Sequence, residues 1–355
     1  MFDFIKSYLG IGPVLGVDIG TASIKIVEVR KTSTLPKLIN YGILRSNTHL
    51  DRPNSAIQSS ALKIVEKETA ELLKILIKES GFKAREAVAS IPVFSVFITL
   101  LEMPQMPEAD VAKAMAFQIK QHIPLPVSEV AIDWLKVGDK ETEGGIKQQI
   151  LLISIPKEII KRYQNIFKMA GLRLKALEIE SLSLTRALVG SSLDPTLIID
   201  IGALSTNIAV IEQGFLKLNV SSDIGGASLT TAIANGLGVN VKRAENLKKQ
   251  KGLKAGQAEY ELSTLPLPYL DAIIGESIRA KNKFEREQEK KIEKIFLAGG
   301  GANLSGIDEY FTKQMGAPVS IGDSLSALSC PPEIGVLAKQ LGSELAVAVG
   351  LAIKV

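Results

Sequence analysis

The stretch 15–29, Leu-Gly-Val-Asp-Ile-Gly-Thr-Ala-Ser-Ile-Lys-Ile-Val-Glu-Val, predicts two strands rich in β-branched residues, joined by a turn of small residues. Gly20 in that turn lets the backbone approach an anion, and the hydroxyls of Thr21 and Ser23 can donate hydrogen bonds to it. Lys25 can place a positive charge beside the same anion. The candidate phosphate-binding residues of this hairpin are Gly20, Thr21, Ala22, Ser23 and Lys25.

Asp18 ends the first of these strands. Its carboxylate would repel a phosphate, because both groups are anions, but it can face a magnesium ion through water. The hairpin is therefore a candidate site for a metal–nucleotide complex. The same pattern also fits an ordinary hairpin, so this stretch alone leaves the function open.

A second stretch, 197–211, repeats the design as Leu-Ile-Ile-Asp-Ile-Gly-Ala-Leu-Ser-Thr-Asn-Ile-Ala-Val-Ile. The pattern Asp-Ile-Gly-x-x-Ser occurs at 18–23 and again at 200–205. Two such hairpins far apart in the chain predict a duplicated architecture, in which one loop from each half closes on the phosphates. The metal then receives one aspartate from each half, Asp18 and Asp200, through water. The other candidates in the second hairpin are Gly202, Ser205, Thr206 and Asn207.

A third stretch, 295–306, reads Ile-Phe-Leu-Ala-Gly-Gly-Gly-Ala-Asn-Leu-Ser-Gly. An apolar strand enters three glycines, which let the backbone lie flat against a planar group such as adenine. A plain strand-to-helix turn gives the same pattern, so only the three stretches together are specific. The candidate adenosine contacts are Gly299, Gly300, Gly301 and Asn303.

In this order and at these separations, the three loops resemble those of the actin-like ATPase superfamily, which includes actin, DnaK-type chaperones, sugar kinases, MreB and FtsA. Further segments resemble the PilM family, the cytoplasmic actin-like proteins of the type IV pilus inner-membrane assembly platform. These segments are Gln-Ile-Lys-Gln-His-Ile-Pro-Leu-Pro at 118–126, Ala-Ile-Asp-Trp at 131–134 and Leu-Glu-Ile-Glu-Ser-Leu-Ser-Leu at 177–184. The resemblance implies an α/β, actin-like (ribonuclease H-like duplicated) two-lobed ATPase fold with an inserted FtsA-type 1C subdomain.

The patterns from 85 to 174 predict a β-β-α-β-β-α block, with helices at 108–122 and 157–169. By resemblance this block is an SHS2-like subdomain 1C that carries partner specificity. A helix over 59–80 and a short amphipathic helix over 1–12, packed on the body, are also predicted. The implied domains are 1–84 as the first part of lobe 1 (1A), 85–174 as 1C, 175–194 as the continuation of 1A, 195–325 as lobe 2 (2A, with a 2B insertion at about 228–290) and 326–355 as a return to lobe 1.

The superfamily resemblance implies further contacts with the nucleotide. Glu245 and Lys248 match the Ala-Glu-x-x-Lys helix that touches ribose and base in MreB-like proteins. A surface salt bridge between residues i and i+3 explains the same pair, so both interpretations stay open. Gly225 and Gly226 fit the wall of the same pocket.

Hydrolysis needs a carboxylate or amide that orients a water in line with the γ-phosphate. By resemblance to MreB and FtsA, this candidate catalytic residue is Glu180, with Glu178 as the second choice. A glutamate there permits hydrolysis without proving it, and alternation along the strand also allows Lys25 to point away from the nucleotide. We therefore expect nucleotide binding, with weak or no ATPase activity.

The composition of the 355 residues fits about two folded domains. Lys+Arg 42 against Asp+Glu 38 gives a formal net charge of +4, which is too mild to argue for nucleic acid. The single cysteine, Cys330, excludes an internal disulfide, and no window reaches ~18 uninterrupted apolar residues. We therefore expect a cytoplasmic protein that is peripheral to the inner membrane through its partners.

The leading hypothesis is an ATP-binding scaffold of the type IV pilus inner-membrane assembly platform. ATP and Mg²⁺ close the two lobes, and a groove beside subdomain 1C binds the N-terminal cytoplasmic tail of PilN, as the resemblance implies. Other pilus platform proteins are further expected partners, and self-association is left open. The second hypothesis is an FtsA/MreB-like polymerising ATPase of cell division or shape. The third is a small-molecule kinase, for which the sequence offers no obvious substrate-binding aspartate.

Overall fold

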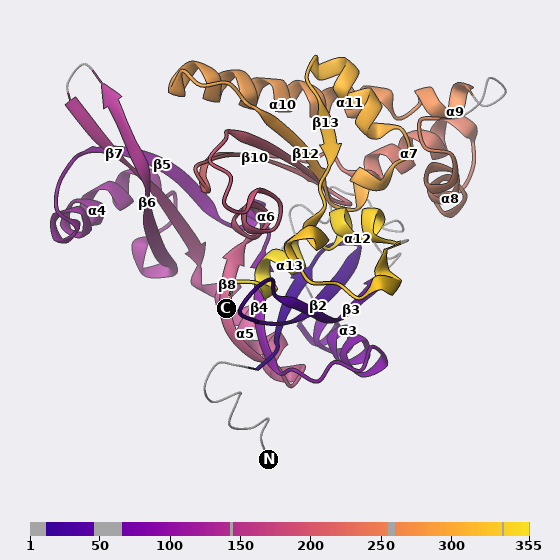
Figure 1. Cartoon of the computed structure of the whole chain (residues 1–355), viewed down its shortest axis with the longest axis horizontal. Helices are drawn as coiled ribbons and strands as arrows, with labels where there is room; N and C mark the ends of the chain where they lie inside the picture. Colours follow the sequence, from indigo (N-terminus) through magenta and orange to yellow (C-terminus); the bar gives the residue numbers. More distant parts are fainter. Residues whose placement is uncertain (1–11, 46–65, 143–144, 255–259, 336, 355) are drawn as a thin grey trace.

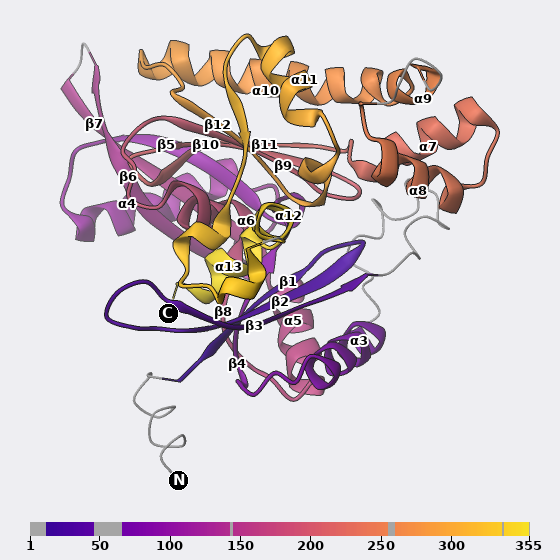
Figure 2. The same cartoon turned by 45° about the vertical axis from the view of Figure 1, so that its right-hand side comes forward.

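The computed structural model describes residues 12–45, 66–142, 145–254, 260–335 and 337–354. Almost all of the predicted helix over 1–12 and the first part of that over 59–80 lie outside these residues. In the described part of the chain, strands form two five-stranded sheets and one three-stranded sheet. Figures 1 and 2 show the two larger sheets in separate halves of the molecule, with the smaller sheet to one side.

The first lobe is built on the hairpin predicted at 15–29. Its strands are β1 (Val14–Ile19), β2 (Ser23–Arg30), β3 (Lys37–Arg45), β4 (Glu86–Ile91) and β8 (Arg173–Ile179), and its helices are α3 (Glu66–Glu79) and α5 (Lys157–Met169). Every residue of β1 is buried, because this mostly apolar strand lies in the middle of the order β3-β2-β1-β4-β8. β1 pairs antiparallel with β2 and parallel with β4, and α5 packs on α3 and β8.

The second lobe repeats this topology. Its strands are β9 (Thr196–Ile201), β10 (Thr206–Glu212), β11 (Phe215–Ser222), β12 (Lys294–Ala298) and β13 (Val319–Ile321). Its helices are α7 (Gly226–Leu237), α8 (Val241–Lys251), α9 (Tyr260–Thr264), α10 (Leu267–Gln288) and α11 (Ile307–Met315). The order β11-β10-β9-β12-β13 again joins three antiparallel strands to two parallel ones. The predicted duplication is therefore confirmed at the level of strand order and direction.

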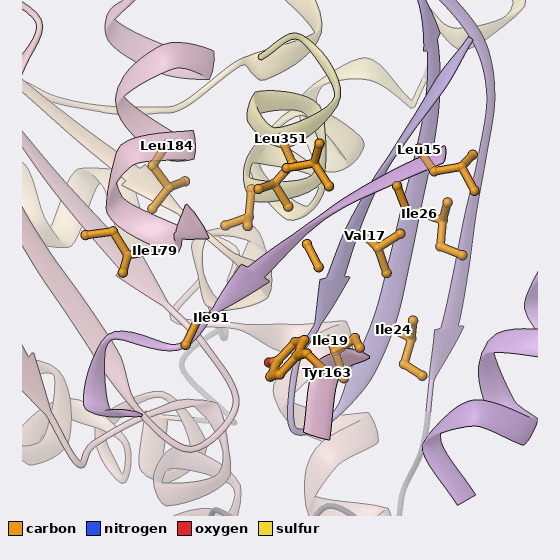
Figure 3. Close-up of a cluster of buried hydrophobic side chains, with 14 of the residues drawn as sticks. Leu15, Val17, Ile19, Ile24, Ile26, Ile91, Tyr163, Ile179, Leu184 and Leu351 are labelled. Atoms are coloured by element: carbon orange, nitrogen blue, oxygen red, sulfur yellow. The ribbon is translucent and has the colours of Figure 1, made fainter. Parts of the chain in front are cut away.

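Three short helices join the lobes: α6 (Glu180–Leu184), α12 (Ala338–Glu344) and α13 (Ala346–Ala352). All of α13 is buried, and it packs on β1 and α6 (Figure 1). Two glycines allow the contact, since a Cβ on Gly16 would stand 1.9 Å from the Ala348 carbonyl oxygen and one on Gly350 1.9 Å from that of Ser183. Figure 3 shows the buried side chains around this junction. The C-terminal segment thus packs on the first lobe.

The third sheet and its helix form the insert, which consists of β5 (Phe97–Pro104), α4 (Glu108–His122), β6 (Val130–Thr142) and β7 (Gly145–Pro156). α4 has the predicted bounds. The insert as a whole, however, runs only from Phe97 to Pro156 and is shorter than the predicted subdomain 85–174. β4 pairs with β1 and β8 in the first sheet, and α5 packs on α3, so both belong to the first lobe. The predicted boundaries are therefore wrong at both ends of the insert, because sheet pairing assigns these elements elsewhere.

The insert has two apolar faces. Leu152 and Ile150 on β7 pack with Met115 of α4 on one face. On the other face, Leu151 and its neighbours join the main core, which also holds Leu216 of β11. This alternation follows from the two-residue period of a strand, and it places this face of the insert against a core that the first lobe shares with β11 of the second lobe. In the described residues, no helix is both long enough and apolar enough to cross a membrane.

Candidate functional site

A cleft of about 350 Å³ lies between the two lobes. Both hairpin turns, the glycine loop after β12, and residues of α7, α8 and α12 line it. The cleft therefore brings together groups that lie far apart in the sequence. The predicted site residues that line it are Asp18, Gly20, Thr21, Ala22, Ser23, Lys25, Glu180, Asp200, Gly202, Ser205, Asn207, Gly226, Glu245, Lys248, Gly299, Gly300, Gly301 and Asn303.

The two hairpin turns have the same hydrogen-bond geometry. In the first, the Gly20 N–H donates to the Ser23 carbonyl at 3.0 Å, and in the second the Gly202 N–H donates to the Ser205 carbonyl at 2.9 Å. The second turn also anchors α7, because the Gly226 N–H donates to the Gly202 carbonyl at 2.9 Å. The repeated sequence pattern thus folds into a repeated turn, and both copies face one cleft.

Asp18 is buried, and both of its carboxylate oxygens accept hydrogen bonds. The Lys25 ammonium donates to one oxygen at 2.9 Å, and the Ser90 hydroxyl donates to the other at 2.9 Å. Lys25 therefore points toward Asp18 and lines the cleft, which decides between the two orientations left open by the strand pattern. Asp200 enters the same cleft from the end of β9.

The carboxylates of the cleft influence each other. Burial raises the pKa of Asp200 to about 6, with Asp18 adding to the rise and Lys25 opposing it. Burial also raises the pKa of Glu180 well above its usual value, and the two aspartates add to this shift. Burial lowers the pKa of Lys25, but the attraction of Asp18 outweighs it and the pKa is raised overall. A bound cation would stabilise this group of acids in its ionised form.

Two carboxylates of the cleft, Asp18 and Asp200, could hold a hydrated magnesium ion. Among the described residues, no group of three or more His, Cys, Asp or Glu side chains could hold a metal ion. Mg²⁺ keeps several waters and is commonly bound by one or two carboxylates together with substrate phosphates. Asp18 and Asp200 line one cleft together with both hairpin turns, so the two carboxylates suit such an ion.

The glycine loop lies directly against the end of β9. Gly299 has a φ of +78°, and a Cβ there would stand 2.3 Å from the Asp200 Oδ1 atom. The loop is held by α12, since the Gly299 N–H donates to the Ser343 carbonyl at 3.0 Å and the Asn303 amide donates to the Gln340 carbonyl at 3.1 Å. A glycine is therefore required at 299, and α12 fixes the wall on this side of the cleft.

α8 lines a further part of the cleft. Lys248 forms a 2.7 Å ion pair with Glu245, and its ammonium also donates to the Gly226 carbonyl at 2.8 Å and the Thr230 hydroxyl at 2.7 Å. Burial tends to raise the pKa of Glu245, but Lys248 and the hydrogen bonds around it lower it to about 2. The sequence left two interpretations of Glu245 and Lys248 open, a salt bridge and a position in the nucleotide pocket. The structure shows the salt bridge, and both residues also line the cleft.

Some predicted residues lie outside the cleft lining. The Thr206 hydroxyl donates to the Ile224 carbonyl at 2.7 Å and its side chain is fully buried, while Gly225 stands behind the second turn, packed on the Ala203 backbone. Glu178, the second choice for the water-orienting residue, instead pairs with Arg186 at 2.8 Å. Thr206 and Gly225 thus support the second turn without facing the cleft.

Other lining residues have no signal in the sequence. Arg45 at the end of β3 reaches the buried Glu344 of α12, with its guanidinium nitrogen 2.8 and 2.7 Å from the two carboxylate oxygens. Phe94, which is 46% exposed, stands at the rim. Such residues come from segments whose local sequence is ordinary, so only the fold reveals them. The further lining side chains include Gln340, Ser343 and Lys249.

A sequence profile of the family described as type IV pilus assembly protein PilM matches residues 16–355. The chain belongs to this PilM family. The predicted family is therefore confirmed. FtsA of Enterococcus hirae is also similar, with 24% identity over 349 residues that cover 87% of this chain and 78% of that protein.

Solved structures confirm the actin-like fold of this PilM-family chain. A PilM–PilN type IV pilus biogenesis complex is similar with a TM-score of 0.79, at 22% identity, over 96% of this chain and 98% of that chain. MreB5 of Spiroplasma citri, solved with ADP, has a TM-score of 0.52 at 15% identity, over 96% of this chain and 95% of that chain. Together with the family match, these likenesses identify an actin-like protein of the pilus assembly family.

Proposed function

We propose that this PilM-family chain binds ATP with Mg²⁺ in the cleft between its lobes. The observation that carries the proposal is the pair of matching turns, which set Asp18 and Asp200 on one cleft. Backbone N–H groups and hydroxyls at such turns suit phosphate oxygens. Asp18 and Asp200 hold the magnesium ion through water, and the ion supplies the positive charge that the phosphates and carboxylates need between them. The MreB5 structure with bound ADP supports this reading of the fold.

The adenosine lies between α8 and the glycine loop. Glu245 is ionised at neutral pH, because its pKa is about 2, so it can only accept hydrogen bonds. A ribose hydroxyl is a suitable donor, and Lys248 holds the carboxylate in place at 2.7 Å. On the other side, the backbone at Gly299 and Gly300 offers a flat surface to the base.

Glu180 lines the cleft, and in this proposal its carboxylate orients a water toward the γ-phosphate, in surroundings that favour slow turnover. In the nucleotide-free chain, burial and the two aspartates raise the pKa of its carboxyl, which favours the protonated form. A protonated carboxyl is a poor acceptor for a water proton, so Glu180 must lose its proton to the effect of the bound ion before hydrolysis, and turnover is slow. Phosphate release should therefore be slow, and Glu180→Gln should remove what remains.

The nucleotide-loaded chain then acts as a scaffold of the pilus assembly platform. We propose that it binds the N-terminal cytoplasmic tail of a PilN protein beside the insert. The family assignment and the solved PilM–PilN complex support this partner. An extended tail gains main-chain hydrogen bonds along such a surface and specificity from side-chain pockets. Through this tail the chain is held at the inner membrane.

Nucleotide binding is tested by calorimetry and thermal unfolding with ATP, with and without Mg²⁺. At about 100-fold excess over its Kd, a ligand adds about 2.7 kcal/mol to the free energy of unfolding. The double variant Asp18→Ala, Asp200→Ala should lose the magnesium-dependent part of this shift. Asp194→Ala is the matched control, since Asp194 is exposed on the same lobe and pairs only with surface groups. Equal shifts in all three proteins would refute the proposed site.

The partner is tested by titrating a synthetic peptide of the PilN N-terminal segment onto the purified chain, with a scrambled peptide as control. No binding with or without ATP would count against the proposed partner. The FtsA relatives favour one alternative, a polymerising ATPase. ATP-dependent filaments in electron micrographs, together with a substantial ATPase rate, would support that alternative instead.

A further inference from the structure

The second lobe and the insert meet at two facing β-bulges. In β11, the register with β10 shifts so that Lys217 is an extra residue with no opposite partner in the ladder. In β6, the register with β7 shifts between Lys136 and Gly138, which leaves Val137 as the extra residue. A bulge redirects the groups of its extra residue. Here the two extra residues meet, because the Lys217 ammonium donates to the Val137 carbonyl at 2.7 Å.

This contact, the Lys217 latch, is buried and charged. Lys217 is 6% exposed, and its ammonium also donates to the Gln149 side-chain oxygen at 2.8 Å. The buried carboxylate of Glu212 lies 3.7 Å away and in turn pairs with Lys290. Gly138 leaves room for the lysine, since a Cβ there would stand 2.7 Å from the Lys217 Nζ atom. Moving the insert away from the second lobe would therefore remove two of the acceptors of a buried ammonium, which costs free energy.

The same hairpin reaches the cleft. Asn207 on β10 lines the cleft and accepts a hydrogen bond from the Asn219 amide at 2.9 Å. Asn219 and Lys217 both belong to β11, two positions apart. Asn207 also donates to the Ser181 hydroxyl at 2.8 Å, next to Glu180 in α6. The β10–β11 hairpin thus carries a cleft residue on one strand and the latch on the other.

We infer that the Lys217 latch makes the insert follow the second lobe, so that nucleotide in the cleft sets the position of the insert against the first lobe. This inference rests on the proposed function, because the tail of the partner binds beside the insert. Occupancy of the cleft therefore changes the affinity for the tail, and by linkage the tail changes the affinity for nucleotide by the same factor. When the second lobe moves on nucleotide binding, the latch moves the insert with it, because each packed sheet moves as a rigid body.

The test compares the affinity for the PilN tail peptide with and without AMPPNP and Mg²⁺ in three proteins. In the unmodified chain we expect a change of about fivefold or more, the usual lower end of such coupling. Lys217→Met keeps an unbranched apolar stem, shorter by one atom, but removes the donors, and should bring the ratio to within about twofold of one. Nucleotide affinity itself should be unchanged, since Lys217 does not line the cleft.

Lys290→Met is the matched control, because Lys290 pairs with the same Glu212 but makes its bond outside the insert. It should keep the coupling of the unmodified chain. If Lys290→Met loses the coupling as completely as Lys217→Met, the effect is one of general charge loss and the inference is wrong. If Lys217→Met fails to fold, Gln149→Met removes the side-chain acceptor of the latch on the insert and should lower the coupling in the same direction.

A second measurement does not need the peptide. Spin labels on the exposed Lys78 of α3 and Glu141 of β6, in a Cys330→Ser background, report the distance between first lobe and insert. AMPPNP with Mg²⁺ should shift this distance in the unmodified chain and not in Lys217→Met. If the peptide binds with the same affinity with and without nucleotide, and the distance between the spin labels does not change, the latch is wrong while the proposed partner stands. A peptide that never binds would refute the partner, and the distance measurement would then decide the latch alone.

Discussion

Asp200→Asn is expected to flatten the pH dependence of stability between pH 7 and pH 5. Burial raises the pKa of the Asp200 carboxyl to about 6 in the folded chain, whereas an unfolded aspartate titrates at about 3.9. Between these two values the folded state binds a proton that the unfolded state does not bind. The free energy of unfolding of the nucleotide-free protein therefore rises as the pH falls through 6, and asparagine removes that contribution.

From pH 7 to pH 5, one carboxyl with these two pKa values is expected to add about 1.3 kcal/mol to the free energy of unfolding. Urea unfolding at pH 5, 6 and 7 measures it, as the difference between the unmodified and Asp200→Asn proteins at each pH. Acids outside the cleft cancel in this difference, whereas Glu180 does not, because Asp200 contributes to the shift of its pKa. Asp194→Asn is the control, because Lys294 and Ser192 hold the pKa of Asp194 below its usual value, outside this window. Equal pH slopes for the unmodified and Asp200→Asn proteins would refute the reasoning.

The same carboxyl should release protons when the magnesium nucleotide binds, since the ion favours the ionised form. At pH 6 the release is about half a proton per site, and at pH 7 about a tenth. Calorimetric titrations in two buffers of different ionisation enthalpy measure this number. Release that is the same at both pH values, or unaffected by Asp200→Asn, would show that another group titrates.

Three further changes test the packing around the cleft. Gly299→Ala puts a methyl group 2.3 Å from Asp200 at a positive φ, so the free energy of unfolding should fall by about 1–2 kcal/mol, measured with urea, and calorimetry should show weaker ATP binding. Arg186→Met strips the guanidinium from the buried Glu178 and leaves only a lysine partner, so urea unfolding should show a loss of about 3 kcal/mol. Gly350→Ala drives a methyl group into an α6 carbonyl, so it should cost about 3 kcal/mol and lower the thermal midpoint.

The two hairpins could be predicted from the sequence because their signals are local. A run of β-branched residues, a glycine and two hydroxyls fix a strand, a turn and a second strand within 15 residues or so, and the pattern occurs twice. The structure places Asp18 and Asp200 in one cleft, as the duplication predicts. Lys25 needed the structure, because alternation along a strand leaves open which face of the sheet meets the cleft.

The rest of the cleft wall could not be predicted, since its residues are brought there by distant packing. α12 joins the glycine loop through Ser343 and Gln340 only because α13 returns to β1, and neither helix carries a nucleotide motif. Thr206 is the opposite case, a residue that the sequence predicts in the cleft but the structure places outside its lining. Its hydroxyl matches the pattern of a phosphate ligand, but the strand turns it inward, where the Ile224 carbonyl is the available acceptor.

The insert shows why register is the hardest feature to predict. β4 and β5 are both short and apolar, and only their pairing assigns one to the first sheet and the other to the insert. The Lys217 latch depends on a single extra residue in each of two strands, and one residue of slip would turn the lysine to the opposite face. The two-residue period of a strand gives no signal for one extra residue in a bulge. The proposed coupling between cleft and insert therefore depends on two bulges that can be identified only when the strands are paired.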